Sequence, residues 1–226
     1  SLAQYKSACD AVEKILMFTV FAGISRLMRA GPLPEGLFPF LLKGKLSFGV
    51  WRDLALALGK QLETSHAQDA AARALASLCS SGLLSPTGKV IELVESRNKN
   101  SHFGIGKDED AYQSEAAFAT SVLEDLSEEL SAFKEYQLIS VEGMRYSGQN
   151  SANVPVFKYT LRTHQGDDEV FPCIEEERSD LLGEKWCFLL RSGEQPLSLE
   201  PFVFAGLNPT GRVEVCLATN IPEPGH

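Results

Sequence analysis

The spacing of apolar residues changes once along the chain, and this change divides the chain into two parts. From Ala3 to about Gln137 apolar positions recur every three or four residues, whereas from about Leu138 onward they recur every second residue. The first spacing is typical of amphipathic helices and the second of half-buried strands. The pattern therefore predicts an α+β protein, in which an antiparallel bundle of about five helices (residues 1–137) precedes a small antiparallel β part (residues 138–226) of unknown role.

Helix start and stop signals set the limits of the expected helices. The glycine and prolines of Gly31-Pro-Leu-Pro34 stop the first helix, and Ser47 and Thr87 are good N-cap residues for later ones. Acidic residues suit the first turn of the last helix because they face its positive dipole end. The predicted helices lie before Gly31, from Ser47, from Ser65 to Cys79, from Thr87 to about Gly104 and from Asp108 to about Tyr136.

Alternating segments separated by turn-like sequences predict five or six antiparallel strands in the second part. The acidic run Glu175–Glu177 is interpreted as a solvated loop rather than a metal site, and His164 is placed in a turn. Trp51 and Trp186 have apolar neighbours and are expected to be core anchors. The segments with strand spacing are residues 136–146, 154–163, 169–175, 184–192, 197–206 and 212–219.

Length and composition describe a globular chain that bears no membrane anchor. The 226 residues are 44% hydrophobic and 23% charged, and the longest strongly apolar run, Ile15–Ile24, is half of the roughly 20 residues that a bilayer span needs. The five cysteines lack any CxxC spacing and no signal peptide is visible, so we expect the protein to lie in the reducing cytoplasm. We expect the cysteines themselves to be small apolar residues of the core. The chain opens with Ser-Leu-Ala rather than Met, which suggests a processed chain or a domain of a longer protein.

The formal net charge of −9 disfavours a protein coated in positive charge for nucleic-acid binding, but the charge is unevenly distributed. Residues 1–107 hold 13 Lys and Arg against 8 Asp and Glu, a net charge of +5, whereas residues 108–226 hold 8 against 22, a net charge of −14. A basic bundle is expected to attract RNA, and the acidic β part to bind a basic partner or ligand. The alternative, that both parts are merely soluble, stays open.

One polar cluster, Glu95–His102 (ESRNKNSH), interrupts the fourth expected helix at its C-terminal end. At about 100° per residue, Arg97 and His102 lie roughly 140° apart around the helix axis, while Asn98 and His102 share a face. Imidazole, amide and guanidinium groups together suit metal-free phosphoryl transfer on RNA. In such a reaction the ribose 2′-hydroxyl is the nucleophile, histidine is the acid or base, and arginine holds the phosphate.

The run Arg97-Asn98-Lys99-Asn100-Ser101-His102 resembles the R-[polar]-x-x-x-H motif of HEPN domains, at the same place near the end of a late bundle helix. The resemblance covers about residues 3–136. It implies a metal-independent endoribonuclease for single-stranded RNA, used in toxin or antiviral defence systems, in which Arg and His of two protomers meet across a homodimer interface. It also implies that Arg97 binds the phosphate, that His102 is the general acid or base, and that Asn98 orients them. Lys99, Asn100 and Ser101 are the substrate-binding candidates; no metal or cofactor is expected.

Two alternatives remain open at this point. Arg97 and Lys99 would also complement the negative end of the helix dipole, with His102 ending the helix before Gly104. Some HEPN domains have lost activity, so the chain is alternatively a non-catalytic dimerisation or regulatory module of a larger defence or signalling protein. In that case the β part would bind a ligand or a partner.

Overall fold

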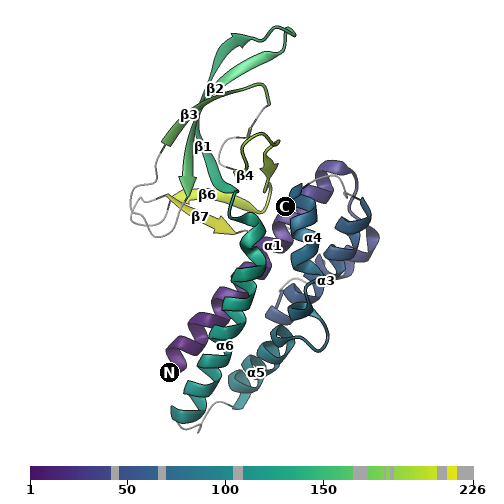
Figure 1. Ribbon diagram of the computed structural model, residues 1–226, viewed down its shortest axis with the longest axis vertical. Helices are drawn as coiled ribbons and strands as arrows, with labels where there is room; N and C mark the ends of the chain where they lie inside the picture. Colours follow the sequence, from purple (N-terminus) through teal and green to yellow (C-terminus); the bar gives the residue numbers. More distant parts are fainter. Residues whose placement is uncertain are drawn as a thin grey trace, which may run out of the picture. The chain divides into compact units, whose positions relative to one another are not determined.

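A computed structural model describes residues 1–41, 46–65, 70–103, 109–164, 173–180, 182–183, 186–207 and 213–217. The chain forms two compact units, Ser1–Phe133 and Lys134–Thr219. The first holds the helices and the second the strands (Figure 1). This order confirms the α+β class with helices first and a small antiparallel sheet after them.

Six α-helices and three 3₁₀ turns are described in the first unit. The expected start at Ser47 is confirmed, because α3 begins at the next residue, Phe48, and the backbone N–H of Trp51 donates to the Ser47 carbonyl. The fourth long helix begins at Lys89, two residues after the expected cap Thr87, and the last ends at Glu129 before a 3₁₀ turn rather than near Tyr136. The helices are α1 (Leu2–Ala30), α2 (Phe38–Leu41), α3 (Phe48–Ser65), α4 (Ala70–Cys79), α5 (Lys89–Phe103) and α6 (Glu109–Glu129), and the turns are η1 (Glu35–Leu37), η2 (Gly82–Leu84) and η3 (Leu130–Phe133). None of them, over the described segments, has the length and apolarity needed to cross a bilayer.

Helix α1 packs against both α3 and α6. The approach to α3 is close at Gly23, where an added Cβ would lie 2.2 Å from Cδ2 of Leu58, a fully buried side chain. A larger residue at position 23 would require the Leu58 side chain to move within the core, so the two helices approach closely at Gly23. In the same interface, Phe21 of α1 and Trp51 of α3 meet edge to face with ring centroids 5.3 Å apart, which confirms Trp51 as a core anchor.

The helices of the bundle do not all alternate in direction. The Ser1 ammonium nitrogen lies 3.9 Å from Oε1 of Glu109, so α1 and α6 start at the same end and run side by side in the same direction (Figure 1). Helix α5 runs opposite to α6, because Lys89 at its start contacts Asp125 late in α6 at 2.6 Å. The C-terminal end of α5 therefore lies beside the N-terminal halves of both α1 and α6.

The second unit contains two antiparallel sheets. Five strands form one sheet in the order β3-β2-β1-β4-β5, and the other two form the second. The segment at residues 197–206, expected as one strand, is two, β5 and β6, because Pro201 between them has no backbone N–H to donate. The strands are β1 (Gln137–Gln149), β2 (Pro155–His164), β3 (Cys173–Arg178), β4 (Cys187–Leu190), β5 (Leu197–Ser198), β6 (Val203–Leu207) and β7 (Val213–Leu217).

The acidic run is solvated, but the loop expected for it is wrong: it belongs to the edge strand β3. Glu177 is the register partner of Lys158 on β2, and the Lys158 ammonium lies 2.5 Å from a carboxylate oxygen of Glu175. Opposite charges on neighbouring strands stabilise a strand that has few apolar residues, and charged side chains also keep an edge strand from pairing with other chains.

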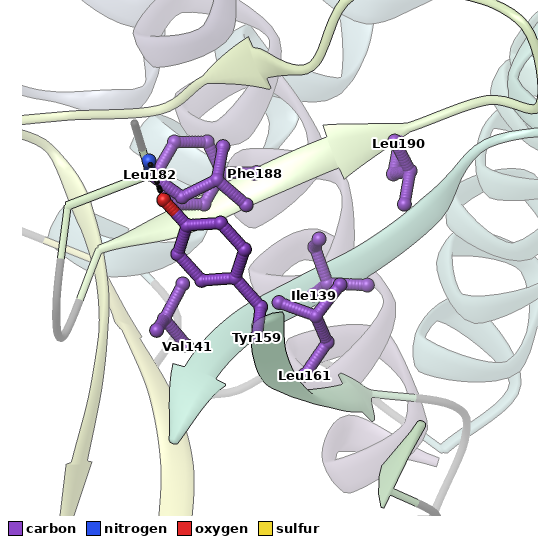
Figure 2. Packing of buried hydrophobic residues seen from close by; sticks show 7 residues of the cluster. All are labelled: Ile139, Val141, Tyr159, Leu161, Leu182, Phe188 and Leu190. Carbon is purple, nitrogen blue, oxygen red and sulfur yellow. Dashed lines mark hydrogen bonds between the residues drawn. The ribbon is translucent and has the colours of Figure 1, made fainter. Parts of the chain in front are cut away.

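The core of the β unit lies on one face of the larger sheet and is built around Tyr159 (Figure 2). The Tyr159 side chain is fully buried, its hydroxyl donates to the carbonyl of Asp180 at 3.1 Å, and it accepts from the backbone N–H of Leu182 at 3.2 Å. These bonds hold the segment after β3 against the sheet. The cluster consists of Ile139, Val141, Tyr159, Leu161, Leu182, Phe188 and Leu190, with Phe157 and Trp186 packed on it.

Three of the cysteines are core residues, as expected: Cys9, Cys79 and Cys187 are buried. Burial raises the pKa of the Cys79 thiol and of the Cys187 thiol to about 12. Cys173 differs from the expectation, because it begins the edge strand β3 and is exposed.

Replacing Tyr159 by Phe tests the hydroxyl that anchors the β unit. We expect Tyr159→Phe to lower the free energy of unfolding by about 1 to 3 kcal/mol, since the N–H of Leu182 loses its acceptor inside the core. The control is Tyr146→Phe, because Tyr146 is 62% exposed and should change by less than about 0.5 kcal/mol. Denaturant titration followed by tryptophan fluorescence measures both values, and equal losses in the two variants would contradict the role given to the Tyr159 hydroxyl.

Candidate functional site

The polar cluster predicted from the sequence occupies the last two turns of α5. Asn98 and Lys99 are exposed, Arg97 is half-buried and faces α1, and Asn100 is half-buried and faces α6. The backbone of α5 continues through Ser101 and His102, whose side chains lie outside the described part of the structure. The candidates therefore fall into two groups, one directed to solvent and one that joins the bundle.

Arg97 is held by two carboxylates of α1. Its Nη2 lies 2.9 Å from Oε2 of Glu13 and 3.6 Å from Oδ1 of Asp10, and its guanidinium carbon lies 5.3 Å from the centroid of the Phe48 ring. The Arg97 side chain keeps 33% of its surface exposed. Two negative charges beside one positive charge leave this corner of the molecule with a local charge of −1. Glu13 and Asp10 are site residues that sequence reasoning missed, because their partner lies more than 80 residues away along the chain.

A second set of hydrogen bonds lies beside Arg97 and joins α1, α5 and α6. The Tyr5 hydroxyl and the Ser96 hydroxyl lie 3.1 Å apart, and the Asn100 amide donates to Oε2 of Glu115 at 2.8 Å and to Ser96 at 3.5 Å. Burial raises the pKa of Tyr5 and of Cys9, outweighing neighbouring groups that lower it. Both groups are therefore neutral at physiological pH. The amide nitrogen of Asn100 already has two partners within the bundle.

Comparison with family models, curated proteins and solved structures finds no match. The resemblance to HEPN domains therefore rests on the run from Arg97 to His102 and on its place at the end of α5.

The electropositive bundle expected from the sequence is corrected by the extent of the helical unit. The expected bundle runs to residue 137, but the charge division at residue 107 leaves out α6, which packs on α1 and belongs to the same unit as Arg97. Counted over residues 1–133, 13 Lys and Arg stand against 16 Asp and Glu, so the net charge is −3 rather than +5. General electrostatic attraction of RNA to the whole unit is thus absent, and any RNA binding has to be local.

The β unit contains a pocket of about 650 Å³ beside the edge strand β3. Arg178, only 12% exposed in its side chain, binds Asp180 through two hydrogen bonds and Glu176 through a third. Arg191 binds Glu194 at 3.1 Å and also pairs with Glu135. The positively charged lining residues are Arg178 and Arg191, and the negatively charged ones are Glu135, Glu176, Glu177, Asp180 and Glu194. The pocket therefore carries an excess of three negative charges, in line with the expectation of an acidic β part.

His164 is the last residue of β2, so its expected place in a turn is corrected. Its Nε2 lies 2.9 Å from Oγ of Ser140, a Ser–His pair that sequence reasoning missed because the two residues are 24 positions apart. Ser140 is fully buried and cannot act as a nucleophile on an external substrate. Within the described residues, no group of His, Cys, Asp and Glu side chains is arranged to hold a metal ion.

The partial burial of the His164 imidazole predicts a pH-dependent stability for the β unit. Burial, and then the charge of Arg162, lower the pKa of His164, while Glu142 acts in the opposite direction. The unfolded chain, with its histidine pKa near 6.5, binds protons that the folded chain does not, so stability falls as the pH drops below about 6.5. We expect His164→Gln, which keeps a donor for Ser140, to flatten the decline between pH 7.5 and 5.5. Denaturant titrations at several pH values measure this, and parallel curves for both proteins would contradict it.

Proposed function

We propose that the helical unit is a HEPN-type endoribonuclease that cleaves single-stranded RNA without a metal ion and acts as a homodimer. The observation that carries this proposal is the Arg97–His102 run at the end of α5, with Arg97 accessible over a third of its surface and Asn98 and Lys99 exposed beside it. The setting we propose is a toxin or antiviral defence system in the cytoplasm, where the five cysteines would remain reduced.

In the proposed reaction the ribose 2′-oxygen attacks the adjacent phosphorus and the bond to the 5′-oxygen breaks. Arg97 binds the phosphate and stabilises the charge that develops on its oxygens. His102 removes the proton from the 2′-hydroxyl or supplies one to the leaving 5′-oxygen, which suits an imidazole with a pKa near neutrality. Asn98 orients these groups, and the Arg97 of one protomer acts with the His102 of the other.

Removing either proposed catalytic group should abolish cleavage. We expect His102→Ala and Arg97→Ala to reduce the rate by about 10² to 10⁴, the usual loss for a positioned acid–base or phosphate-binding group. Cleavage of a fluorescent single-stranded RNA in EDTA measures the rate, and His66→Ala, which changes the other histidine of the helical part, is the matched control. Pure, dimeric protein that leaves a mixed RNA pool intact, with or without divalent ions, would overturn the proposal.

A second candidate function is a non-catalytic regulatory module whose β unit binds a cationic ligand or a basic partner. The observation that favours it is the pocket beside β3, where five carboxylates surround two arginines. Both arginines already have carboxylate partners, and the lining of the pocket as a whole keeps an excess of three negative charges. Ammonium groups would be attracted to it, and anions would be repelled.

Spermidine is a suitable probe for this pocket. We expect it to raise the melting temperature of the protein, because a ligand that binds only the folded state stabilises that state. Glu176→Gln, which keeps an acceptor for Arg178, should reduce the rise by more than half. The control is Glu175→Gln, the adjacent residue on β3, which does not line the pocket but removes the same charge. Equal shifts in both variants would rule out specific binding there.

A further inference from the structure

We infer that helix α1 competes with RNA for Arg97, because the carboxylates of Asp10 and Glu13 occupy the part of the guanidinium that a phosphate would bind. The three residues are called the α1 clamp here. The inference rests on the proposed role of Arg97 as the phosphate ligand and adds a regulation of that site. In the RNA-free protein the clamp lowers the affinity for RNA, because a phosphate has to displace the carboxylates before Arg97 can bind it.

The two carboxylate contacts of Arg97 converge on one of its guanidinium nitrogens. Both carboxylates approach the same nitrogen, Nη2, at 2.9 Å from Glu13 and 3.6 Å from Asp10. The Phe48 ring lies over the guanidinium at 5.3 Å from its centroid. A phosphate that seeks the usual paired contact with two guanidinium nitrogens therefore meets Glu13 at one of them.

The charges of the clamp act in the same direction as its geometry. A phosphodiester carries one negative charge, and the clamp already has a local charge of −1 within a helical unit whose net charge is −3. The Glu13 side chain is only 18% exposed, so its charge is screened by water less than that of Asp10, at 61%. Glu13 is therefore the main competitor, and Asp10 is the minor one.

Neutralising Glu13 should strengthen RNA binding without adding any contact. Glu13→Gln keeps a side chain of the same size that hydrogen-bonds Arg97 through its amide oxygen, but it removes the charge that competes with phosphate. The expected gain in affinity is about three- to tenfold, the range that a partly exposed charged hydrogen bond supplies. Asp10→Asn should give a smaller gain of about twofold, and because Asp10 lies on the surface this variant tests the clamp even if Glu13→Gln folds poorly.

The experiment measures binding of a 2′-O-methyl single-stranded RNA, which has no nucleophile and stays intact, by fluorescence anisotropy at low and moderate salt. The matched control is Glu95→Gln, which removes an exposed carboxylate of α5 about 200° around the helix axis from Arg97. We expect Glu13→Gln to bind three- to tenfold more tightly than the wild type and Glu95→Gln to stay within twofold. The gain should vanish when Arg97→Ala is added to Glu13→Gln.

The outcomes separate the clamp from the proposed function. If Arg97→Ala weakens binding but neither Glu13→Gln nor Asp10→Asn binds more tightly than Glu95→Gln, the clamp is wrong and the role of Arg97 stands. If Arg97→Ala binds as well as the wild type, Arg97 is not the phosphate ligand, and both the proposed role and the clamp are wrong. Thermal unfolding of every variant shows which of them are folded.

Discussion

The packing of helix α1 against the rest of the bundle is the constraint on which the helical unit depends. Close approach to α3 at Gly23 brings the aromatic and aliphatic residues of the two helices together, and the parallel course beside α6 brings its N-terminal turns to the end of α5. Once α1 has this course, Tyr5, Asp10 and Glu13 have to face the polar turns of α5. The apolar packing of one half of α1 thus decides which polar groups meet at its other half.

Much of the fold follows from periodicity, and the exceptions have local causes. The change from a spacing of three or four residues to one of two separates the helices from the strands, and it lies close to the observed boundary after Phe133. The sequence predicts a loop for the acidic run Glu175–Glu177 because these residues give no apolar alternation, whereas their pairing depends on Lys158 in the neighbouring strand. The turn predicted for His164 follows from the glycine and aspartates after it, whereas its contact with Ser140 comes from another strand and is not visible in the local sequence.

The candidate site was predictable in its residue types but not in its environment. The run from Arg97 to His102 indicates phosphate chemistry, and helical spacing shows which of its residues share a face. Spacing along one helix gives no information about Glu13 or Glu115, because these residues come from helices whose direction and distance are set by tertiary packing. The same packing changes the electrostatic picture, since α6 brings its carboxylates into the unit that was expected to be basic.

The contacts of Arg97 with Asp10, Glu13 and Phe48 bear both on its structural role in the bundle and on its proposed role as a phosphate ligand. An arginine that only ended a helix would need the carbonyl groups of its own last turn. Arg97 instead reaches across to two carboxylates and an aromatic ring on other helices, and it keeps a third of its side-chain surface exposed. A buried ion pair would resist exchange, whereas a partly exposed one can be displaced by another anion at modest cost. The degree of burial of the Arg97–Glu13 contact, more than the presence of the motif, decides whether Arg97 only stabilises the bundle or can also bind a phosphate.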